Sequence, residues 1–177
     1  MSGVSVNAWV AFGGMGYSYM YLNGARFSQA NGEYVLTNLP GGARVQVEVY
    51  KDGFIQQCAA PPMVMSSDAT IDTQLVSRDN LSASPEGVTP TPGLRFITGV
   101  VYENTPAGKA PVAGAWVDYE PTTEVFAAAT YSDSEGRYML CGIPEDEPAE
   151  VGAWLDSRRN AYVTAPPHVT SIDLVVP

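Results

Sequence analysis

Apolar and polar side chains alternate with a period of two along most of the chain, which is typical of half-buried β-strands. Residues 4–12 show the pattern most clearly, with one face formed by Val4, Val6, Ala8, Val10 and Phe12. Residues 44–49 repeat it with three valines on one face. No stretch has the apolar spacing of three to four residues that an amphipathic helix needs. The pattern therefore predicts an all-β protein.

Glycine and proline separate the predicted strands. The chain has 17 Gly and 14 Pro, which suits a β protein with many turns. Asn23-Gly24 favours a type I′ hairpin turn after the segment Tyr17–Tyr21, because both central residues tolerate positive φ. A second hairpin strand is expected from Ala25 to Gln29.

One segment occurs twice. Asn31–Pro40 and Glu135–Pro144 each consist of a glycine turn, an alternating strand with Tyr and Leu on one face, and a Leu-Pro or Ile-Pro corner. Three further pairs of segments match in the same order: Val47–Lys51 with Val151–Leu155, Ala60–Val64 with Ala165–Val169, and Thr70–Asp72 with Ser171–Asp173. Repetition over so long a period indicates a duplicated domain.

The duplication predicts a first repeat over residues 1–78, a linker over 79–93 and a second repeat over 94–177. The linker is rich in Pro, Thr and Ser, and a Thr-Pro-Thr-Pro run favours an extended, semi-rigid backbone. Linker spacing is one interpretation, and glycosylation is another. Its candidate acceptors are Asn80, Ser82, Ser84, Thr89 and Thr91.

The two repeats differ at their beginnings. The second opens with the strand Phe96–Tyr102, followed by Pro111–Tyr119. Matching Asn7–Phe12 with Gly114–Tyr119 leaves the first repeat without a counterpart of that opening strand. A competing alignment makes residues 4–12 the opening strand and Tyr17–Tyr21 the next one. We favour the missing strand, which would leave an unpaired edge for another strand to cover.

Three segments of the second repeat carry a family pattern. Gly99–Val101, Pro111–Val117 and Thr130–Pro144 together resemble the carboxypeptidase regulatory-like domain, also called peptidase-associated or transthyretin-like. The pattern is similar also to the B-type repeats of surface adhesins. The resemblance implies two tandem Greek-key β-sandwiches of the immunoglobulin or prealbumin kind. It also implies an accessory or structural module without catalytic residues.

Charge restricts the partners. The net charge of −10 argues against a nucleic-acid partner, which needs clustered Lys and Arg. The first 20 residues lack the features of a secretory signal, and no apolar run has the length of a bilayer, so membrane insertion is not expected. A β-sandwich repeat protein of this kind is expected outside the cell or on its surface.

Few side chains offer catalytic or metal chemistry. His168 is the single histidine, so neither a His-activated nucleophile nor a His-rich metal centre is expected, and we predict no enzyme activity and no cofactor. Calcium binds loop carboxylates more permissively. Its weak candidates here are Asp133, Glu135, Glu145, Asp146 and Glu147.

Aromatic residues offer a binding surface. Trp9, Tyr17, Tyr19 and Tyr21 are candidates for an interface or for stacking on sugar, while the plain alternative is that the tyrosines form half of a core. Cys58 and Cys141 could pair with each other, pair between chains, or stay reduced.

The sequence thus predicts a non-enzymatic structural subunit of an extracellular filament or adhesin that assembles with copies of itself through β-strand pairing. The alternative is a carbohydrate- or peptide-binding accessory module of a larger secreted enzyme. The first predicts oligomers or fibres, and the second predicts monomers that bind glycans.

Overall fold

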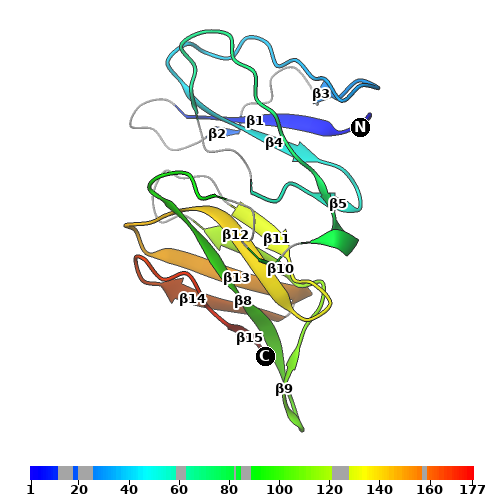
Figure 1. Ribbon diagram of the computed structural model, residues 1–177, viewed down its shortest axis with the longest axis vertical. Coiled ribbons are helices and arrows are strands. Elements are labelled where there is room, and N and C mark those ends of the chain that lie inside the picture. Colours follow the sequence, from blue (N-terminus) through cyan, green and yellow to red (C-terminus); the bar gives the residue numbers. More distant parts are fainter. Residues whose placement is uncertain are drawn as a thin grey trace. The chain divides into compact units, whose positions relative to one another are not determined.

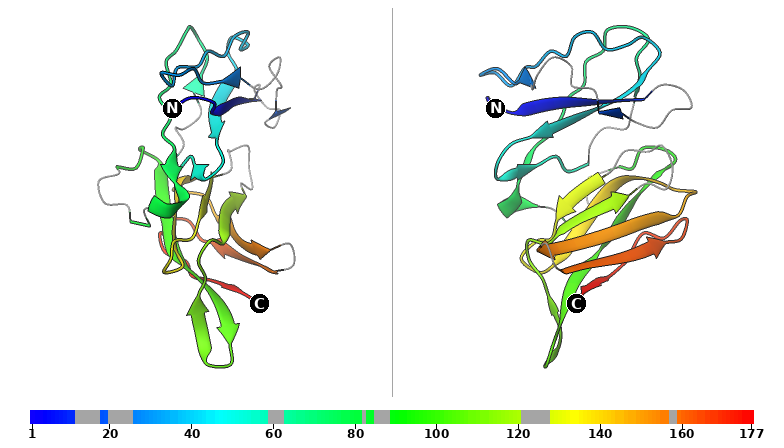
Figure 2. Two further views of the ribbon diagram at one scale, coloured as in Figure 1. Left: turned by 90° about the vertical axis from the view of Figure 1, so that its right-hand side faces the viewer. Right: turned by 180° about the vertical axis from the view of Figure 1, so that it is seen from behind.

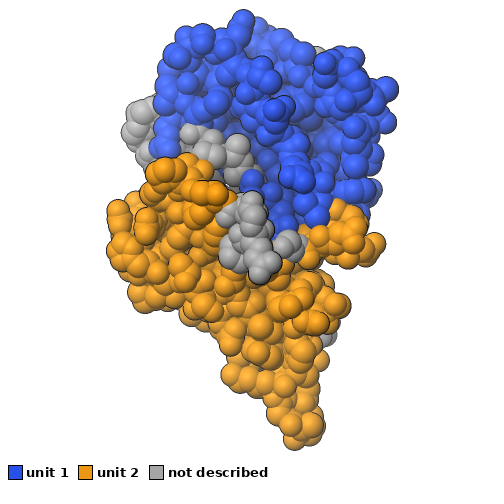
Figure 3. All heavy atoms as spheres, in the orientation of Figure 1, with its two compact units in different colours: residues 1–76 blue, residues 77–177 orange. Residues whose placement is uncertain are grey.

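A computed structural model describes residues 1–11, 18–19, 26–58, 63–81, 83–84, 89–120, 128–156 and 159–177 of the chain. The described residues form strands and one short 3-10 turn, so the predicted all-β class is confirmed (Figure 1). They divide into two compact units, Met1–Val76 and Ser77–Pro177 (Figure 3). No helix among them is long and apolar enough to cross a membrane. The predicted turn at Asn23-Gly24 lies outside the described residues.

Unit 2 is a sandwich of two sheets. One sheet has the order β11 (Ala128–Tyr131), β10 (Trp116–Glu120), β13 (Ala149–Asp156), β14 (Arg159–Ala165), with all neighbours antiparallel. The other has the order β12 (Arg137–Pro144), β8 (Leu94–Thr105), β15 (Leu174–Val176). Here β8 runs antiparallel to β12 and parallel to β15. The opening strand of the unit is therefore the central strand of its sheet.

The core of unit 2 lies between these sheets. Ile97 and Val101 of β8 are fully buried against Tyr138, Leu140 and residues of the opposite sheet. The start of β8 is fixed by Arg95, which is only 4% exposed and donates to the carbonyls of Glu145, Glu147 and Pro166. The C-terminal end of β8 continues beyond the sandwich and forms a hairpin with β9 (Gly108–Pro111). Figure 2 shows this hairpin extending from the unit.

Unit 1 has one substantial sheet. Its centre is the antiparallel pair of β1 (Ser5–Ala11) and β4 (Arg44–Tyr50). Short strands extend this pair: β2 (Ser18–Tyr19) and β3 (Arg26–Phe27) beside β1, and β6 (Met63–Val64) beside β4. A separate pair joins β5 (Phe54–Ile55) to β7 (Val76–Ser77), where unit 1 ends, and the 3-10 turn η1 (Arg78–Asn80) belongs to unit 2.

The sequence predicts one strand after Asn31 and another from Thr70 to Val76, but the structure has no β-strand at residues 33–40 or 68–75. Residues 33–40 and 68–75 are described, but no β-ladder joins them to another strand among the described residues. The predicted alternation is nevertheless present, because Tyr34 and Leu36 face the sheet while Val35, 65% exposed, faces outward. The residues of segment 33–40 thus have strand-like side-chain placement without a β-ladder to any described strand.

The two units share detailed local geometry. Ser28 accepts from the Val4 amide and donates to the Met1 carbonyl, at 3.1 and 2.8 Å. Ser132 in unit 2 makes the same pair of bonds to Ala115 and Val112, at 2.9 and 2.7 Å. The following turns also match, because the amides of Gln29 and Asp133 each donate to the carbonyl four residues later, and both turns place a glycine at positive φ, Gly32 and Gly136. Segment 28–40 is therefore the counterpart of segment 132–144.

This geometry corrects the strand match drawn from the Ala-Trp-Val residues. The strands β1 and β10 do correspond, because each pairs with the strand that follows the repeated segment. However, Trp9 lies opposite Gln46, whereas Trp116 lies opposite Trp154. The counterpart of Trp154 in β4 is Tyr50, and the residue opposite Tyr50 is Ser5. Ser5 is therefore the counterpart of Trp116. The true counterpart of Gly114–Tyr119 thus begins at Gly3, four residues earlier than the sequence match. The sequence match was wrong because it relied on the identity of the Ala-Trp-Val residues, which does not reflect the pairing register.

The close packing around Gly99 gives a stability prediction. A Cβ on Gly99 would lie 1.6 Å from the carbonyl oxygen of Ile172 and 3.0 Å from the Tyr138 ring. Gly99→Val is expected to lower the free energy of unfolding of unit 2 by about 3 kcal/mol or more, since backbone must move to admit the side chain. Asn104→Val, at an exposed position of the same strand, is the control. Equal urea midpoints for the two variants would contradict this packing.

Candidate functional site

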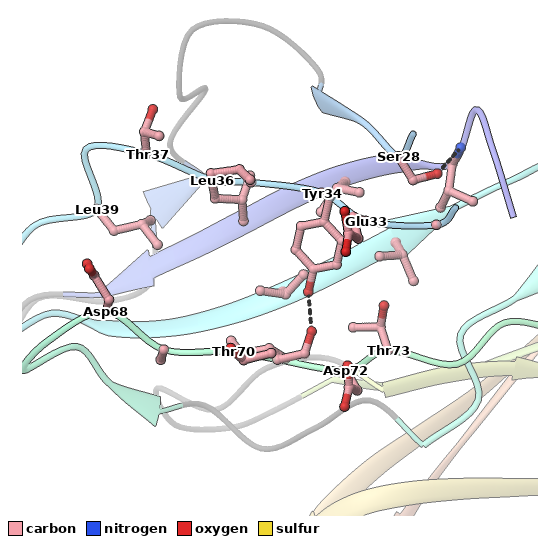
Figure 4. A pocket seen from close by; sticks show the side chains of 18 of the residues that line it. Ser28, Glu33, Tyr34, Leu36, Thr37, Leu39, Asp68, Thr70, Asp72 and Thr73 are labelled. Atoms are coloured by element: carbon pink, nitrogen blue, oxygen red, sulfur yellow. Dashed lines mark hydrogen bonds between the residues drawn. The ribbon is translucent and has the colours of Figure 1, made fainter. Parts of the chain in front are cut away.

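The described part of unit 1 contains a hollow of about 1180 Å³. One side of the hollow is the inner face of β1 and β4, and its two edges are residues 31–39 and 65–75. Figure 4 shows these two segments running on either side of the strands, with Tyr34 reaching from one toward the other. We call this hollow the slot.

The base of the slot is apolar. The base is the buried cluster Val4, Val6, Val47 and Val49, against which half-buried side chains of both edges pack: Tyr34, Leu36, Ile71 and Leu75. Leu39 and Met65 pack against a neighbouring cluster of buried residues. The apolar face of the sheet is thus covered by side chains from two edges that do not pair with each other in a ladder.

A hydrogen bond holds the two edges together. The Tyr34 hydroxyl donates to the carbonyl of Ile71 at 2.7 Å. In unit 2 the Tyr138 hydroxyl donates to the carbonyl of Ile172 at the same distance, 2.7 Å. We call this contact the tyrosine bridge. Because both units form it at equal length, the slot edges of unit 1 correspond to β12 and to the segment leading into β15.

In unit 2 the space between those edges holds β8. Gly99 of β8 pairs with Tyr138, and the missing side chain leaves room for the tyrosine bridge beneath it. The next residue, Val100, donates its amide to Asp173 at 3.0 Å. The residue that corresponds to Asp173 in unit 1 is Asp72, at the edge of the slot. Unit 1 therefore repeats the surroundings of β8, with an open slot where β8 would run.

The side chains beside β8 in unit 2 are more deeply buried than their counterparts at the slot of unit 1. Tyr138 and Leu140, on the strand beside β8, are each 1% exposed. Their counterparts Tyr34 and Leu36 are only half-buried. Ile172 is buried, whereas its counterpart Ile71 is half-buried. The same apolar positions that β8 shields in unit 2 are thus partly open to solvent in unit 1.

The slot has an acidic rim. Among the described residues, the lining contains three carboxylate side chains, Glu33, Asp68 and Asp72, and no Lys, Arg or His. Burial raises the pKa of the Tyr34 hydroxyl, and the charge of Asp72 raises it further, while a hydrogen bond with Thr73 acts in the opposite direction. The tyrosine bridge therefore stays protonated through the physiological range.

Of the predicted aromatic candidates, the structure describes Trp9 and the backbone of Tyr19. Trp9 is on the outward face of β1 and its indole donates to Glu48 at 3.0 Å. Tyr19 pairs in register with Trp9 on the neighbouring strand β2. Tyr17 and Tyr21 lie outside the described residues. The predicted stripe of three tyrosines is thus not placed, and its role stays a prediction.

The calcium candidates are dispersed. Asp133 accepts from the amides of Glu135 and Arg137 and from the Arg137 side chain at 2.9 Å, so it serves the turn. Glu145 and Asp146 lie 3.8 and 3.6 Å from His168. No group of three or more metal-binding side chains occurs among the described residues, which include Glu147. Calcium binding stays an untested prediction.

The remaining candidates are covalent sites. Both Cys58 and Cys141 are disulfide-bonded, so neither is a free thiol, and the pairing of one with the other stays a proposal. Asn80, Thr89 and Thr91 are exposed and Ser84 is half-buried, while Ser82 lies outside the described residues. Glycosylation at these positions is likewise a prediction.

The sequence interpretation missed an aromatic row on unit 2. Tyr131, Trp116 and Trp154 lie in register across three strands, on the outward face of the four-stranded sheet. The Trp116 and Tyr131 ring centroids are 5.0 Å apart, and those of Trp154 and Tyr162 are 5.3 Å apart. Asp118 accepts from both indoles, at 3.1 and 3.3 Å. The alternation of Trp116 with buried Val117 was the available signal.

Comparisons with known proteins give a fold-level likeness only. No family model and no curated protein matches the chain. Among solved structures, two variants of the shaft pilin SpaA from Lactobacillus rhamnosus GG are similar at 11% identity, with TM-scores of 0.37 and 0.36. The matches cover 99% of this chain and 84% and 87% of those chains. The unsubstituted pilin is similar at 10% identity and a TM-score of 0.31. Likeness this low carries no function to the present chain.

The tyrosine bridge gives a pH-dependent prediction. Tyr34→Phe is expected to lower the free energy of unfolding of unit 1 by about 1 kcal/mol at neutral pH, the value of one hydrogen bond. Because the native pKa of Tyr34 is raised, its contribution is complete below the unfolded pKa near 10 and is lost as pH rises through the native pKa. As pH rises above 10, the free energy of unfolding should therefore fall less in Tyr34→Phe than in the wild type.

Urea unfolding between pH 7 and 11 measures both effects. Tyr50→Phe removes a hydroxyl that contacts Asp52 on an exposed side chain, so it controls for the loss of a tyrosine. If the free energy of unfolding fell equally steeply above pH 10 in the wild type and in Tyr34→Phe, the tyrosine bridge would not contribute to the stability of unit 1.

Proposed function

We propose that the chain is a non-enzymatic structural subunit of a surface filament or adhesin, and that unit 1 accepts a β-strand from a neighbouring copy. One observation carries the proposal. The slot repeats the surroundings of β8, including the tyrosine bridge, while its edge segments 33–40 and 68–75 have no ladder partner among the residues that the structure describes. We infer that the slot is the place of a strand equivalent to β8, which the described residues of unit 1 do not contain.

Physical chemistry supports strand addition at this place. An extended segment in the slot would satisfy backbone groups of both edges by main-chain hydrogen bonds, and its alternate side chains would meet the apolar base. Each apolar side chain that becomes buried in this way contributes about 1.5–3 kcal/mol. A strand given by one copy and received by the next is a head-to-tail contact, which generates a filament where the geometry does not close.

The setting of the protein follows from this proposal. We place it outside the cell or on its surface, with copies of itself as partners. The residue pattern of Gly99–Val101, Pro111–Val117 and Thr130–Pro144 supports assigning unit 2 to the carboxypeptidase regulatory-like modules, whose non-catalytic role agrees with a structural subunit.

The aromatic row of unit 2 supports a second candidate. Tyr162 is 44% exposed, and Trp116, Tyr131 and Trp154 are half-buried on an outward sheet face. Such rings could stack on sugars, as an accessory module of a secreted enzyme would require. Monomers that bind glycans, with binding lost in Trp154→Ala, would favour this candidate over assembly.

The assembly proposal is tested by changing one residue of the slot. Leu36→Asp places a charge among the apolar side chains of the slot, so a strand entering it would bury an unpaired carboxylate. We expect loss of oligomers in light scattering and of filaments in negative-stain images. Val35→Asp, at the neighbouring outward position that is 65% exposed, should assemble like wild type.

Circular dichroism and thermal melts check that both variants are folded. A wild-type chain that stays monomeric at high concentration would overturn the proposal. Filaments of unchanged length from folded Leu36→Asp would also overturn it, because the slot would then not be the contact.

A further inference from the structure

We propose that the slot selects its strand by pattern and direction: it takes an extended segment with an apolar-x-Gly-x-apolar pattern, oriented like β8, with its glycine over the tyrosine bridge. The inference rests on the proposed function and deepens it by naming the chemistry of the partner. The model for the pattern is Ile97-Thr98-Gly99-Val100-Val101 of unit 2.

The glycine requirement comes from the tyrosine bridge. In unit 2 the bridge from Tyr138 to Ile172 lies under Gly99, where any Cβ would overlap the Ile172 carbonyl at 1.6 Å. Unit 1 holds Tyr34 and Ile71 at the same 2.7 Å separation. A strand that enters the slot thus meets the same obstruction, so the residue above the bridge must lack a side chain.

The direction follows from the two edges. β8 runs antiparallel to β12 and parallel to β15, and Val100, just after the glycine, donates its amide to Asp173. The counterpart of that carboxylate is Asp72, on the rim of the slot. An occupant antiparallel to residues 33–39 would present the amide after its glycine to Asp72, whereas a reversed strand would present a different backbone group there.

Charge adds a second condition on the occupant. In the part of the lining that the structure describes, Glu33, Asp68 and Asp72 are the charged side chains and all three are acidic. A segment with a basic residue beside its apolar core is therefore favoured over an acidic one. The occupant to which we commit is thus a basic, glycine-centred extended segment of a neighbouring subunit.

The test uses the full chain and a synthetic peptide of residues 94–102, labelled for fluorescence anisotropy. The parent peptide is expected to bind the wild-type chain. The same peptide with Gly99→Val should bind at least about tenfold more weakly, because overpacking of this size costs a factor of ten or more. A peptide with Asn in place of Thr98, beside the glycine, is the matched control and should bind like the parent.

Direction is tested by disulfide trapping. Arg137 pairs with Val100 in unit 2, and Glu33 is the counterpart of Arg137. A chain with Glu33→Cys should therefore capture a peptide with Val100→Cys and fail to capture one with Thr98→Cys. Preferential capture of the second peptide would mean that the strand enters in reverse, which would overturn the inferred direction.

The outcomes separate this inference from the proposed function. Equal binding of the parent and Gly99→Val peptides overturns the glycine requirement but leaves strand acceptance intact. No binding of the parent peptide, in a chain whose filaments are lost in Leu36→Asp, overturns the inferred pattern alone. No peptide binding together with unchanged filaments in Leu36→Asp overturns both.

Discussion

A tyrosine hydroxyl that donates to an isoleucine carbonyl ties together two segments that are distant in sequence, and it does so in both units at 2.7 Å. In unit 2 the bond lies beneath a central strand and is buried. In unit 1 it spans an open slot. Because the bond fixes the separation of the two edges, the slot keeps the shape that a strand requires even when no strand runs through it.

The presence or absence of a neighbouring strand explains why similar residues form different local structure in the two units. Tyr34 and Leu36 face the sheet as their counterparts Tyr138 and Leu140 do, and both segments follow a turn with glycine at positive φ. A β-strand, however, is defined by its hydrogen-bonding neighbour and not by its side chains alone. Segment 137–144 has β8 beside it, whereas segment 33–40 has no ladder among the described residues, so only the former is a strand.

Much of the fold could be predicted from alternation and repetition, because burial on one face imposes a period of two and duplicated residues form duplicated turns. The pairing register could not be predicted from the match of Trp9 with Trp116, because both side chains lie on the outward face, where packing does not constrain register. The slot was foreseen only as a missing strand. Its decisive contact, from Tyr34 to Ile71, depends on a side chain reaching across the fold, and the repeat of Tyr and Ile was the sole trace of it in the sequence.

The central claim is that a strand occupies the slot in the assembled protein, and amide hydrogen exchange tests it most directly. The account predicts that alternate amides of residues 33–39 and 70–75, those directed into the slot, become strongly protected in assembled material relative to the monomer, since an inserted strand would pair with both edges. Amides of β12 and β15, already paired in unit 2, should change little. Assemblies in which residues 33–39 and 70–75 exchange as fast as in the monomer would contradict the account.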